Sequence, residues 1–560
     1  MVASSSKFVR SVVVVALLAA LVVNMRMLQS RSSKGDGEQA AVEVQNVPPT
    51  LALTTMALGP LRGLIVDGLW WRMIQHQDEG RFFETIQLTK WITALQPRFE
   101  QVWAFSAWNL AYNVAYEFPD PEMRWKWTVR AIELLRDDGL RYCPDSAIVR
   151  GELVRLFLDR IGTRVDAGQE TFRQRWAADM MRFLPKGNQP ELLMLREALR
   201  SKDKLFEEEA VRELLNAARV RQMDFSNAER VMWLVKNRSE DVETLLDSPS
   251  RRAVFARLYV WVRASELERV MKINLDHAIF VDREYGPFDW RLSQAHAVYW
   301  AVSGEVSFQE WLTQQDGQRQ IMVRQAMEQS FDQGRFIYDP KSGYSGMTNN
   351  LAIVGKIHDC YDHLMDHSFS PTVDQLHKAF LERAAVILYS FNRRSAARML
   401  YGHYKEDYST GRKGLTFERF IAENMHRALE GGASGSEKTM VESALFQAYL
   451  GVALGDRDRA LGYANLANLA WERNRKTRAE DSPKRLPPFA EMKKSVLQQL
   501  LAVGVNPAMA GRLQEKEASL EADGEEVGEP KGYLGDSVEG GKASGHAHKR
   551  DADSPQPSQR

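Results

Sequence analysis

Residues 80–144 read GRFFETIQLTKWITALQPRFEQVWAFSAWNLAYNVAYEFPDPEMRWKWTVRAIELLRDDGLRYCP. Two helical patterns in this stretch are separated by a turn around Pro97, and a third pattern follows Pro119 and ends at Pro144. Proline ends a helix because it lacks a backbone N–H and its ring clashes with the preceding turn. The stretch therefore predicts helices joined as hairpins, an arrangement that much of the remaining chain repeats loosely.

The spacing of special residues in this stretch fits the tetratricopeptide repeat, a helical hairpin with a period of about 34 residues. If Pro97 closes one repeat, Gly80 lies at the turn between its two helices and the next repeat begins near Glu100. Trp103 then takes the early aromatic position, and Ala107 takes a small position where two helices can cross closely. The sequence therefore predicts an array of stacked helical hairpins.

A second, partial match to the repeat begins in residues 444–456 and continues through the following helix. Glu472 stands where the pattern has proline, and Gln447 and Gly451 stand where it usually has larger apolar residues. The period also drifts between the two matches, so a less regular helical bundle is the alternative architecture. The small positions of this second match are Ala448, Gly455, Ala460 and Ala467.

The composition narrows the classes of function. Lys+Arg and Asp+Glu both number 74 in the 560 residues, so the formal net charge is zero and general nucleic-acid binding is not expected. The two cysteines, Cys143 and Cys360, form neither a disulfide framework nor a CxxC motif. No phosphate-binding loop, dinucleotide fingerprint or nucleophile elbow occurs. We therefore predict no cofactor and no catalytic residues, although missing motifs leave an enzyme open.

The N-terminus carries an apolar segment. Lys7 and Arg10 precede the run SVVVVALLAALVV at residues 11–23, and Arg26 follows it. The run is shorter than the roughly 20 residues of a membrane span, but residues 8–28 suffice if the flanking arginines reach the headgroups. No small-residue cleavage site follows, so we expect an uncleaved signal-anchor and keep a cleaved secretory signal as the alternative. The expected protein crosses the inner membrane once and has its body exported.

Changes in composition divide the rest of the chain. A polar segment after the anchor predicts a linker, and the acidic, Gly-rich end has too few large apolar residues to fold. The second apolar window, at residues 51–71, is expected to be the buried first helix of the array, with a membrane contact as the alternative. The predicted parts are an anchor at 1–30, a linker at 31–50, an N-terminal helical array at 51–235, a middle array at 236–430, a C-terminal hairpin with a capping helix at 431–510 and a disordered tail at 511–560.

Aromatic residues are dense just after Pro97. Phe105, Trp108, Tyr112 and Tyr116 recur at three- and four-residue spacing, which places them on one helical face. If exposed, such a face binds a peptide or a sugar chain at low entropic cost. If buried, it is the packing seam between hairpins, which is the commoner case. The candidate partner-binding residues are Trp103, Phe105, Trp108, Tyr112 and Tyr116.

Two histidine-bearing segments suggest chemistry. His296 lies on an apolar helix, where we expect a hydrogen-bonded core residue. In residues 358–367, Asp359, His363 and His367 lie four apart along one helical face, and such side chains can chelate a divalent metal ion. The motif is not HExxH and no general base stands nearby. We therefore predict a solvated polar face and assign no metal ligands here.

Several segments resemble a known family: GRFFE at 80–84, QPRF at 96–99, VWAF at 102–105, WNLAYN at 108–113, LLRDDGL at 134–140, YGPFDWR at 285–291 and AHAVYWA at 295–301. They are similar to segments of an uncharacterised bacterial family of membrane-anchored, tetratricopeptide-repeat-like proteins. The resemblance covers roughly residues 50–410. It implies a protein–protein scaffold, and it carries no catalytic motif.

These observations predict an all-α fold, a helical-hairpin solenoid with an N-terminal transmembrane helix and a disordered tail. The predicted function is a membrane-anchored scaffold that binds an unidentified protein in the cell envelope, on the concave surface that stacked repeats build. One alternative is carbohydrate binding or processing by the Trp-rich helices, which needs exposed rings beside paired carboxylates such as Asp137 and Asp138. Another is a metal-dependent enzyme at 358–367, which needs further ligands from another helix.

Overall fold

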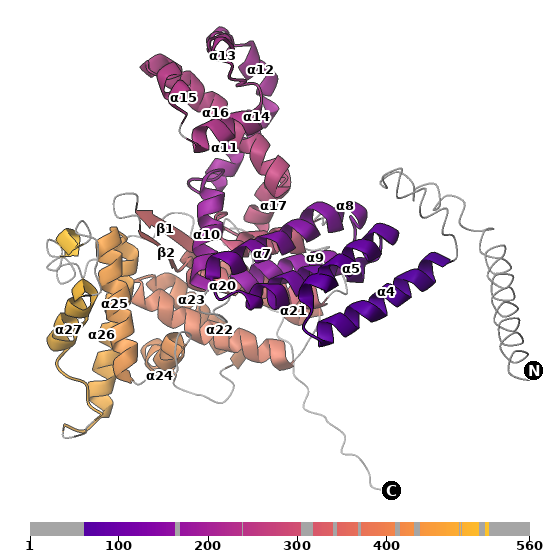
Figure 1. Ribbon diagram of the computed structural model, residues 1–560. Helices are drawn as coiled ribbons and strands as arrows, with labels where there is room; N and C mark the ends of the chain where they lie inside the picture. The colour runs from indigo at the N-terminus through magenta and orange to yellow at the C-terminus, as the bar shows by residue number, and fades with distance from the viewer. Residues whose placement is uncertain are drawn as a thin grey trace, which may run out of the picture. The chain divides into compact units, whose positions relative to one another are not determined.

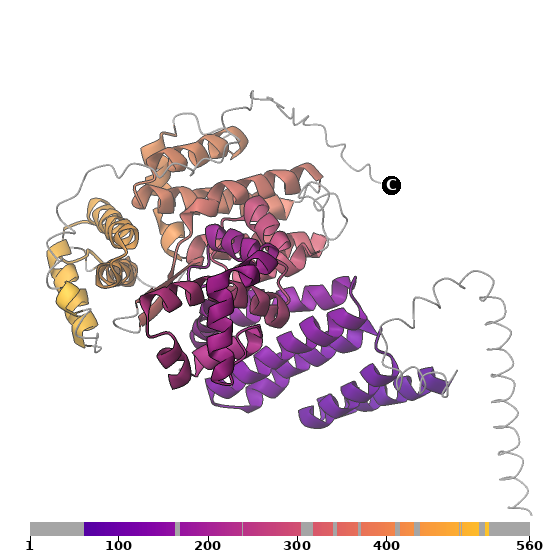
Figure 2. The same cartoon turned by 90° about the horizontal axis from the view of Figure 1, so that it is seen from above.

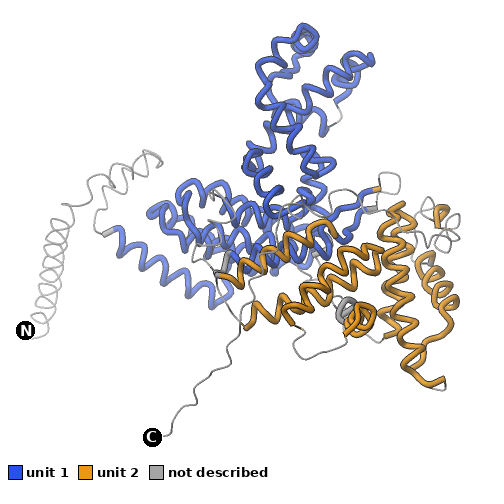
Figure 3. The backbone as a smooth tube through the Cα atoms, turned by 180° about the vertical axis from the view of Figure 1, so that it is seen from behind, with its two compact units in different colours: residues 1–338, 345–350 blue, residues 339–344, 351–560 orange. Residues whose placement is uncertain are grey.

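The chain forms two compact units, which Figure 3 shows in different colours. Unit 1 comprises Met1–Tyr338 and Ser345–Asn350, and unit 2 comprises Asp339–Tyr344 and Leu351–Arg560. The units part near residue 340, inside the segment 236–430 that the sequence treats as one array. The computed structural model describes residues 61–162, 169–237, 239–303, 317–339, 344–367, 371–408, 415–430, 437–480, 482, 484–502 and 510–513.

The predicted all-α class is confirmed. The elements in these ranges are helical except for one two-stranded sheet, which pairs β1 (Arg335–Asp339) with β2 (Tyr344–Thr348). None of the described helices combines the length and the apolar character that a membrane crossing requires. The predicted anchor, the linker and almost all of the predicted tail lie outside the described residues.

The first helices of unit 1 occupy the stretch for which stacked hairpins are predicted (Figure 1). Gly80 lies in the turn before α5, with a φ of +71° that glycine adopts without strain. α6 begins at Glu100, the predicted start of the next repeat, and neighbouring helices pack side by side (Figure 2). The elements are α4 (Leu61–Asp78), α5 (Phe82–Leu95), α6 (Glu100–Trp108), η1 (Asn109–Asn113), η2 (Val114–Glu117), α7 (Pro121–Glu133), η3 (Leu134–Gly139), α8 (Leu140–Tyr142), α9 (Ala147–Arg155) and η4 (Leu156–Ile161).

Local capping explains where these helices begin. Asp120 accepts a hydrogen bond from the backbone N–H of Glu122, and the proline that follows Asp120 starts α7 with its fixed φ. Ser146 caps α9 by accepting from the backbone N–H of Val149 at 3.1 Å. The same hydroxyl donates to the carboxylate of Glu100 at 2.8 Å. The starts of α6 and α9 are thereby tied together.

α4 is buried on one side only. Val66 and Met73 pack into a core cluster with residues of α5 and α6. The predicted burial of the 51–71 window therefore holds for one face of its described part. The other face exposes four large apolar side chains, which are Leu64, Ile65, Trp71 and Ile74.

The centre of unit 1 is α18 (Ser293–Ala301), all 9 residues of which are buried. It packs against α9, η4, α17 (Leu275–Tyr285) and α20 (Gly317–Gln333). His296 on α18 is 1% exposed and its Nε2 lies 3.0 Å from the carbonyl oxygen of Trp290. Burial lowers the pKa of His296 to about 4, so the ring is neutral near pH 7. The prediction of a core histidine is confirmed.

The middle helices of unit 1 have a core of their own, which includes Leu214, Phe225, Leu258 and Trp261. At one end of this core, Glu191 on α11 pairs with Arg263 on α16 at 2.7 Å, with both side chains nearly buried. The helices are α10 (Gln169–Met181), α11 (Gln189–Arg200), α12 (Lys202–Glu207), α13 (Glu209–Val220), α14 (Ala228–Lys236), α15 (Glu240–Leu245) and α16 (Pro249–Met271).

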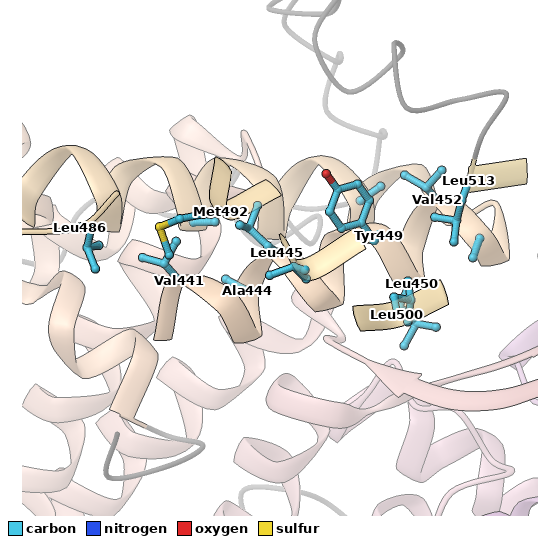
Figure 4. Close-up of a cluster of buried hydrophobic side chains, with 14 residues drawn as sticks. Val441, Ala444, Leu445, Tyr449, Leu450, Val452, Leu486, Met492, Leu500 and Leu513 are labelled. Carbon is cyan, nitrogen blue, oxygen red and sulfur yellow. The ribbon is translucent and has the colours of Figure 1, made fainter. Parts of the chain in front are cut away.

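Unit 2 is a second set of packed helices. A core cluster joins its last three helices, with Val441, Leu445, Tyr449 and Met492 among the buried side chains that Figure 4 shows. The elements are η5 (Leu351–Ile353), α21 (Val354–His367), α22 (Pro371–Ser390), α23 (Arg394–Tyr408), α24 (Phe417–Glu430), α25 (Glu437–Leu454), α26 (Arg457–Thr477) and α27 (Phe489–Ala502).

The hairpin of α25 and α26 explains why Gly451 departs from the repeat pattern. A Cβ atom on Gly451 would lie 2.5 Å from the backbone nitrogen of Ala460, which is closer than real side chains approach. The two helices therefore cross with almost no space between their backbones. Gly455 forms the turn with a φ of +73°, as its predicted place at the end of the first helix requires.

Candidate functional site

A groove of about 490 Å³ opens between α5 and α7, with α6 and η1 as its floor. Its lining is mostly apolar, and it contains three cationic residues and no carboxylate. The lining residues are Ile86, Thr89, Lys90 and Thr93 from α5, Trp103, Ser106 and Leu110 from the floor, and Met123, Lys126, Trp127, Arg130 and Leu134 from α7 and η3. The groove thus lies within the stretch from which the hairpin prediction starts.

The floor of the groove is fixed by Trp103. Its side chain is 5% exposed, and its Nε1 donates to the carbonyl oxygen of Pro97 at 2.7 Å. Its ring also stacks on Tyr142, with centroids 5.9 Å apart. The aromatic and the proline that mark the repeat in the sequence are therefore bonded to each other. Trp103 therefore serves mainly as a buried structural residue beneath the groove, here called its frame, and exposes little surface to a ligand.

One wall of the groove carries the half-buried ring of Trp127, and exposed aromatic rings lie nearby on α5. Trp127 on α7 lies between Phe83 and Phe118, at centroid distances of 6.0 and 6.2 Å. Phe83 is 53% exposed, and Trp91, also on α5, is 50% exposed. The indole Nε1 of Trp127 is shielded from solvent and finds no acceptor among the described residues. A buried donor without an acceptor costs free energy.

The electrostatics of the groove come from Lys90, Lys126 and Arg130. Arg130 is 3.4 Å from the carboxylate of Glu133. Lys90 and Lys126 are exposed, and no carboxylate in the described ranges forms an ion pair with either. The groove therefore combines an apolar surface with two cations that are free to pair with an incoming anion.

Two π-helical turns shape the groove. Leu110 on the floor lies in η1, and Leu134 at the end of one wall lies in η3. A π turn inserts an extra residue into a helix, which widens it locally, and such turns are frequent at functional sites. Here the turns redirect α6 and α7 as they pass along the groove.

The other four candidate residues lie on a different face of the α6 helix from the groove. Phe105 packs against Trp70 of α4 at 5.7 Å, and Trp108 stacks on Tyr112 at 6.4 Å. Burial raises the pKa of Tyr112 to about 12. Tyr116 is 46% exposed, and the guanidinium of Arg160 lies 4.9 Å from its ring centroid. The stripe mainly packs hairpin against hairpin, and Trp103 alone of the five lines the groove.

The wall residues Lys90, Lys126 and Trp127 were not among the candidates from sequence. A signal for them exists, because the α7 residues Met123, Lys126, Trp127, Arg130 and Leu134 recur at helical spacing while mixing apolar and cationic side chains. The carbohydrate alternative requires a free pair of carboxylates such as Asp137 and Asp138. Asp137 instead forms a two-point ion pair with Arg136, at 2.7 and 2.8 Å.

A second group of functional side chains gathers in unit 2. His358 and Asp362 of α21 meet His377 of α22, and one ligand atom from each lies within 4.8 Å of the others. The predicted face was Asp359, His363 and His367. Asp359 is exposed, and the side chain of His367 lies outside the described residues. The face of α21 that meets its neighbours thus begins one residue earlier than the predicted one.

Comparisons with protein-family models, with curated proteins and with solved structures give no match to this chain.

Proposed function

We propose that this protein is a membrane-anchored helical-repeat scaffold that binds a segment of another protein in the cell envelope. The observation that carries the proposal is the groove between α5 and α7, which is apolar and open and holds two lysines without ion-pair partners. Helical hairpins that pack side by side present such grooves to extended or helical segments.

The groove determines what kind of segment fits. Its apolar floor and the ring of Trp127 favour a large apolar side chain on the partner. Lys90 and Lys126 favour carboxylates on either side of that side chain. We therefore propose a partner segment with an apolar anchor flanked by Asp or Glu.

The proposed membrane anchor is the apolar window at residues 8–28, supported by its length and its flanking arginines. The exposed apolar face of α4 adds support, since Trp71 is 66% exposed and Leu64 is 54% exposed on the first helix described after this window. Large apolar residues on a surface helix are typical of helices that rest on a bilayer.

The test is affinity capture of the full chain from detergent-solubilised native membranes, with two matched pairs of substitutions. Trp127→Ala with Lys126→Glu changes the groove wall. Trp233→Ala with Lys236→Glu makes the same changes on α14, where Trp233 is 52% exposed and lies outside the groove. Both variants are first checked for unchanged helicity and melting.

We expect a stoichiometric protein partner with the unchanged chain and with the α14 variant, and loss of that partner with the groove variant. A peptide copied from the partner segment should then bind the unchanged chain at least about 10-fold more tightly than the groove variant. Equal capture by the groove and α14 variants would contradict the proposal.

A further inference from the structure

Three helices of unit 2 bring metal-ligating side chains together from distant parts of the sequence. α21 contributes His358 and Asp362, α22 contributes His377, and α23 contributes His403. The ring centroids of His358 and His403 are 3.9 Å apart, and those of His358 and His377 are 5.3 Å apart. Metal sites inside helical bundles are built in this way, from inward side chains on facing helices.

The two closest histidines have the separation of two ligands on one ion. Nδ1 of His358 lies 3.1 Å from Nε2 of His377. Two imidazole nitrogens bound to one ion with bonds of about 2.0–2.1 Å lie roughly 2.9–3.4 Å apart, depending on the coordination geometry. The side chains of both residues are buried.

A neighbouring hydroxyl fixes the ring of His377. Nδ1 of His377 lies 2.9 Å from the hydroxyl of Tyr408. A hydrogen bond to the far nitrogen of a ligand histidine fixes its ring and leaves the near nitrogen for the ion.

Asp362 supplies a carboxylate at the solvent side of the cluster. It follows His358 by one helical turn, and its Oδ2 lies 3.4 Å from Nε2 of His358. Its side chain is 47% exposed, and one of its oxygens lies within 4.8 Å of a ring nitrogen of each histidine. Asp359, Asp366 and Asp407 act electrostatically on Asp362, which shows that several carboxylates surround the site and favour a cation.

We propose that His358, Asp362 and His377 bind a divalent transition-metal ion of the Zn²⁺ class, with His403 as a further ligand and Tyr408 orienting His377. Two or three imidazoles with one carboxylate suit zinc, and the exposed side leaves a position for water. All of these residues belong to unit 2, whereas the groove belongs to unit 1. A negative result for the metal site would therefore leave the proposed scaffold function untouched, and the reverse also holds.

The experiment uses the full chain, stripped with a chelator and titrated with Zn²⁺, and with Co²⁺ as a spectroscopic probe. We expect one ion per chain with a micromolar or lower Kd. Co²⁺ should give visible absorption bands of a low-coordinate site. Melting should rise by about 5 °C or more at Zn²⁺ a hundredfold above the Kd.

Matched variants separate metal binding from general damage. Asp362→Asn and His377→Gln keep hydrogen-bonding groups at the site, and each should weaken Zn²⁺ binding at least 100-fold. Tyr408→Phe should weaken it about 10-fold. His296→Gln, at a buried histidine of unit 1, should leave it unchanged.

Two results would overturn the proposal. One is a folded, chelator-treated chain that takes up no Zn²⁺ at micromolar concentration, which would make the cluster a hydrogen-bonded network only. The other is uptake that Asp362→Asn and His377→Gln leave unchanged, which would place the ion elsewhere.

Discussion

The groove of unit 1 and the histidine cluster of unit 2 are built in opposite ways. The groove draws on consecutive helices within residues 86–134. Lys126 contacts the sulfur of Met123 at 3.8 Å, but neither Lys90 nor Lys126 has an ion-pair partner in the described chain. The cluster draws on three helices, and Tyr408, His377, His358 and Asp362 contact one another in sequence. The unpaired lysines of the groove can pair only with a molecule from outside. The side chains of the cluster already contact one another, so a bound ion has to replace some of these contacts.

The largest expected effect is on the free energy of unfolding, and it distinguishes Trp103 in the floor of the groove from Trp127 in its wall. Trp103→Ala removes a buried ring and its hydrogen bond to Pro97, and it should lower the free energy of unfolding by about 3–5 kcal/mol. Trp127→Ala, at a partly exposed ring, should cost less than half as much. Denaturant unfolding followed by circular dichroism measures both. Equal costs would mean that Trp127 is part of the frame and not of a binding wall.

A pH experiment compares a lone buried histidine with the clustered ones. The pKa of His296 in the fold is about 4, below its ordinary value near 6.5, so the unfolded chain binds its proton first as pH falls. Stability is therefore lost between pH 6.5 and pH 4, by up to about 3 kcal/mol from this residue. His296→Gln should flatten that slope.

The check is the unfolding midpoint between pH 7 and pH 4.5, with and without Zn²⁺. Zinc should leave the contribution of His296 unchanged, because the lining of its site offers a backbone carbonyl and aromatic rings. A slope that stays the same in His296→Gln would show that other groups carry the acid sensitivity.

Truncating a histidine of the cluster should cost less than removing Trp103. His377→Ala leaves the hydroxyl of Tyr408 and Nδ1 of His358 without their partner, which should destabilise the chain by about 1–3 kcal/mol. Differential scanning calorimetry without metal gives this cost. If the variant melts like the unchanged chain, the hydrogen-bond chain through His377 contributes nothing to the fold.

The smallest expected effect is the salt dependence of partner binding. Lys90 and Lys126 are exposed, so their attraction for an acidic segment is screened by salt. Raising ionic strength from 0.05 to 0.5 M should weaken peptide binding about 3- to 10-fold, measured by fluorescence anisotropy. Lys126→Glu should reduce that dependence. Binding that strengthens with salt would indicate a purely apolar partner.

The sequence predicted the frame of the groove well, because the signals for it are local. Gly80, Pro97 and Glu100 mark a turn, a repeat end and a helix start, and each of these is set by the chemistry of a single residue. The face of α6 that lines the groove was not predicted. α6 is apolar on more than one side, so spacing alone identified the packing stripe of Trp108 and Tyr112 instead.

The histidine cluster of unit 2 could not be predicted from the sequence for a different reason. Almost every residue of the segment 358–367 is polar or titratable, so the spacing of Asp359 and His363 looked as good as that of His358 and Asp362. The distinction depends on which face meets α22, and His377 is 19 residues from His358 along the chain. Such convergence is set by tertiary packing, which periodicity does not encode.

The most direct test of the scaffold account is photocrosslinking from inside the groove. A benzophenone amino acid replaces Lys126 in the full chain, and Lys236 on α14 serves as the matched exposed position, in cells that make the protein. The account expects the probe at 126 to form one dominant adduct with another protein, at an apolar residue flanked by Asp or Glu, and the probe at 236 to form none. Adducts of equal yield at both positions, or none at 126 in a folded protein, would contradict it.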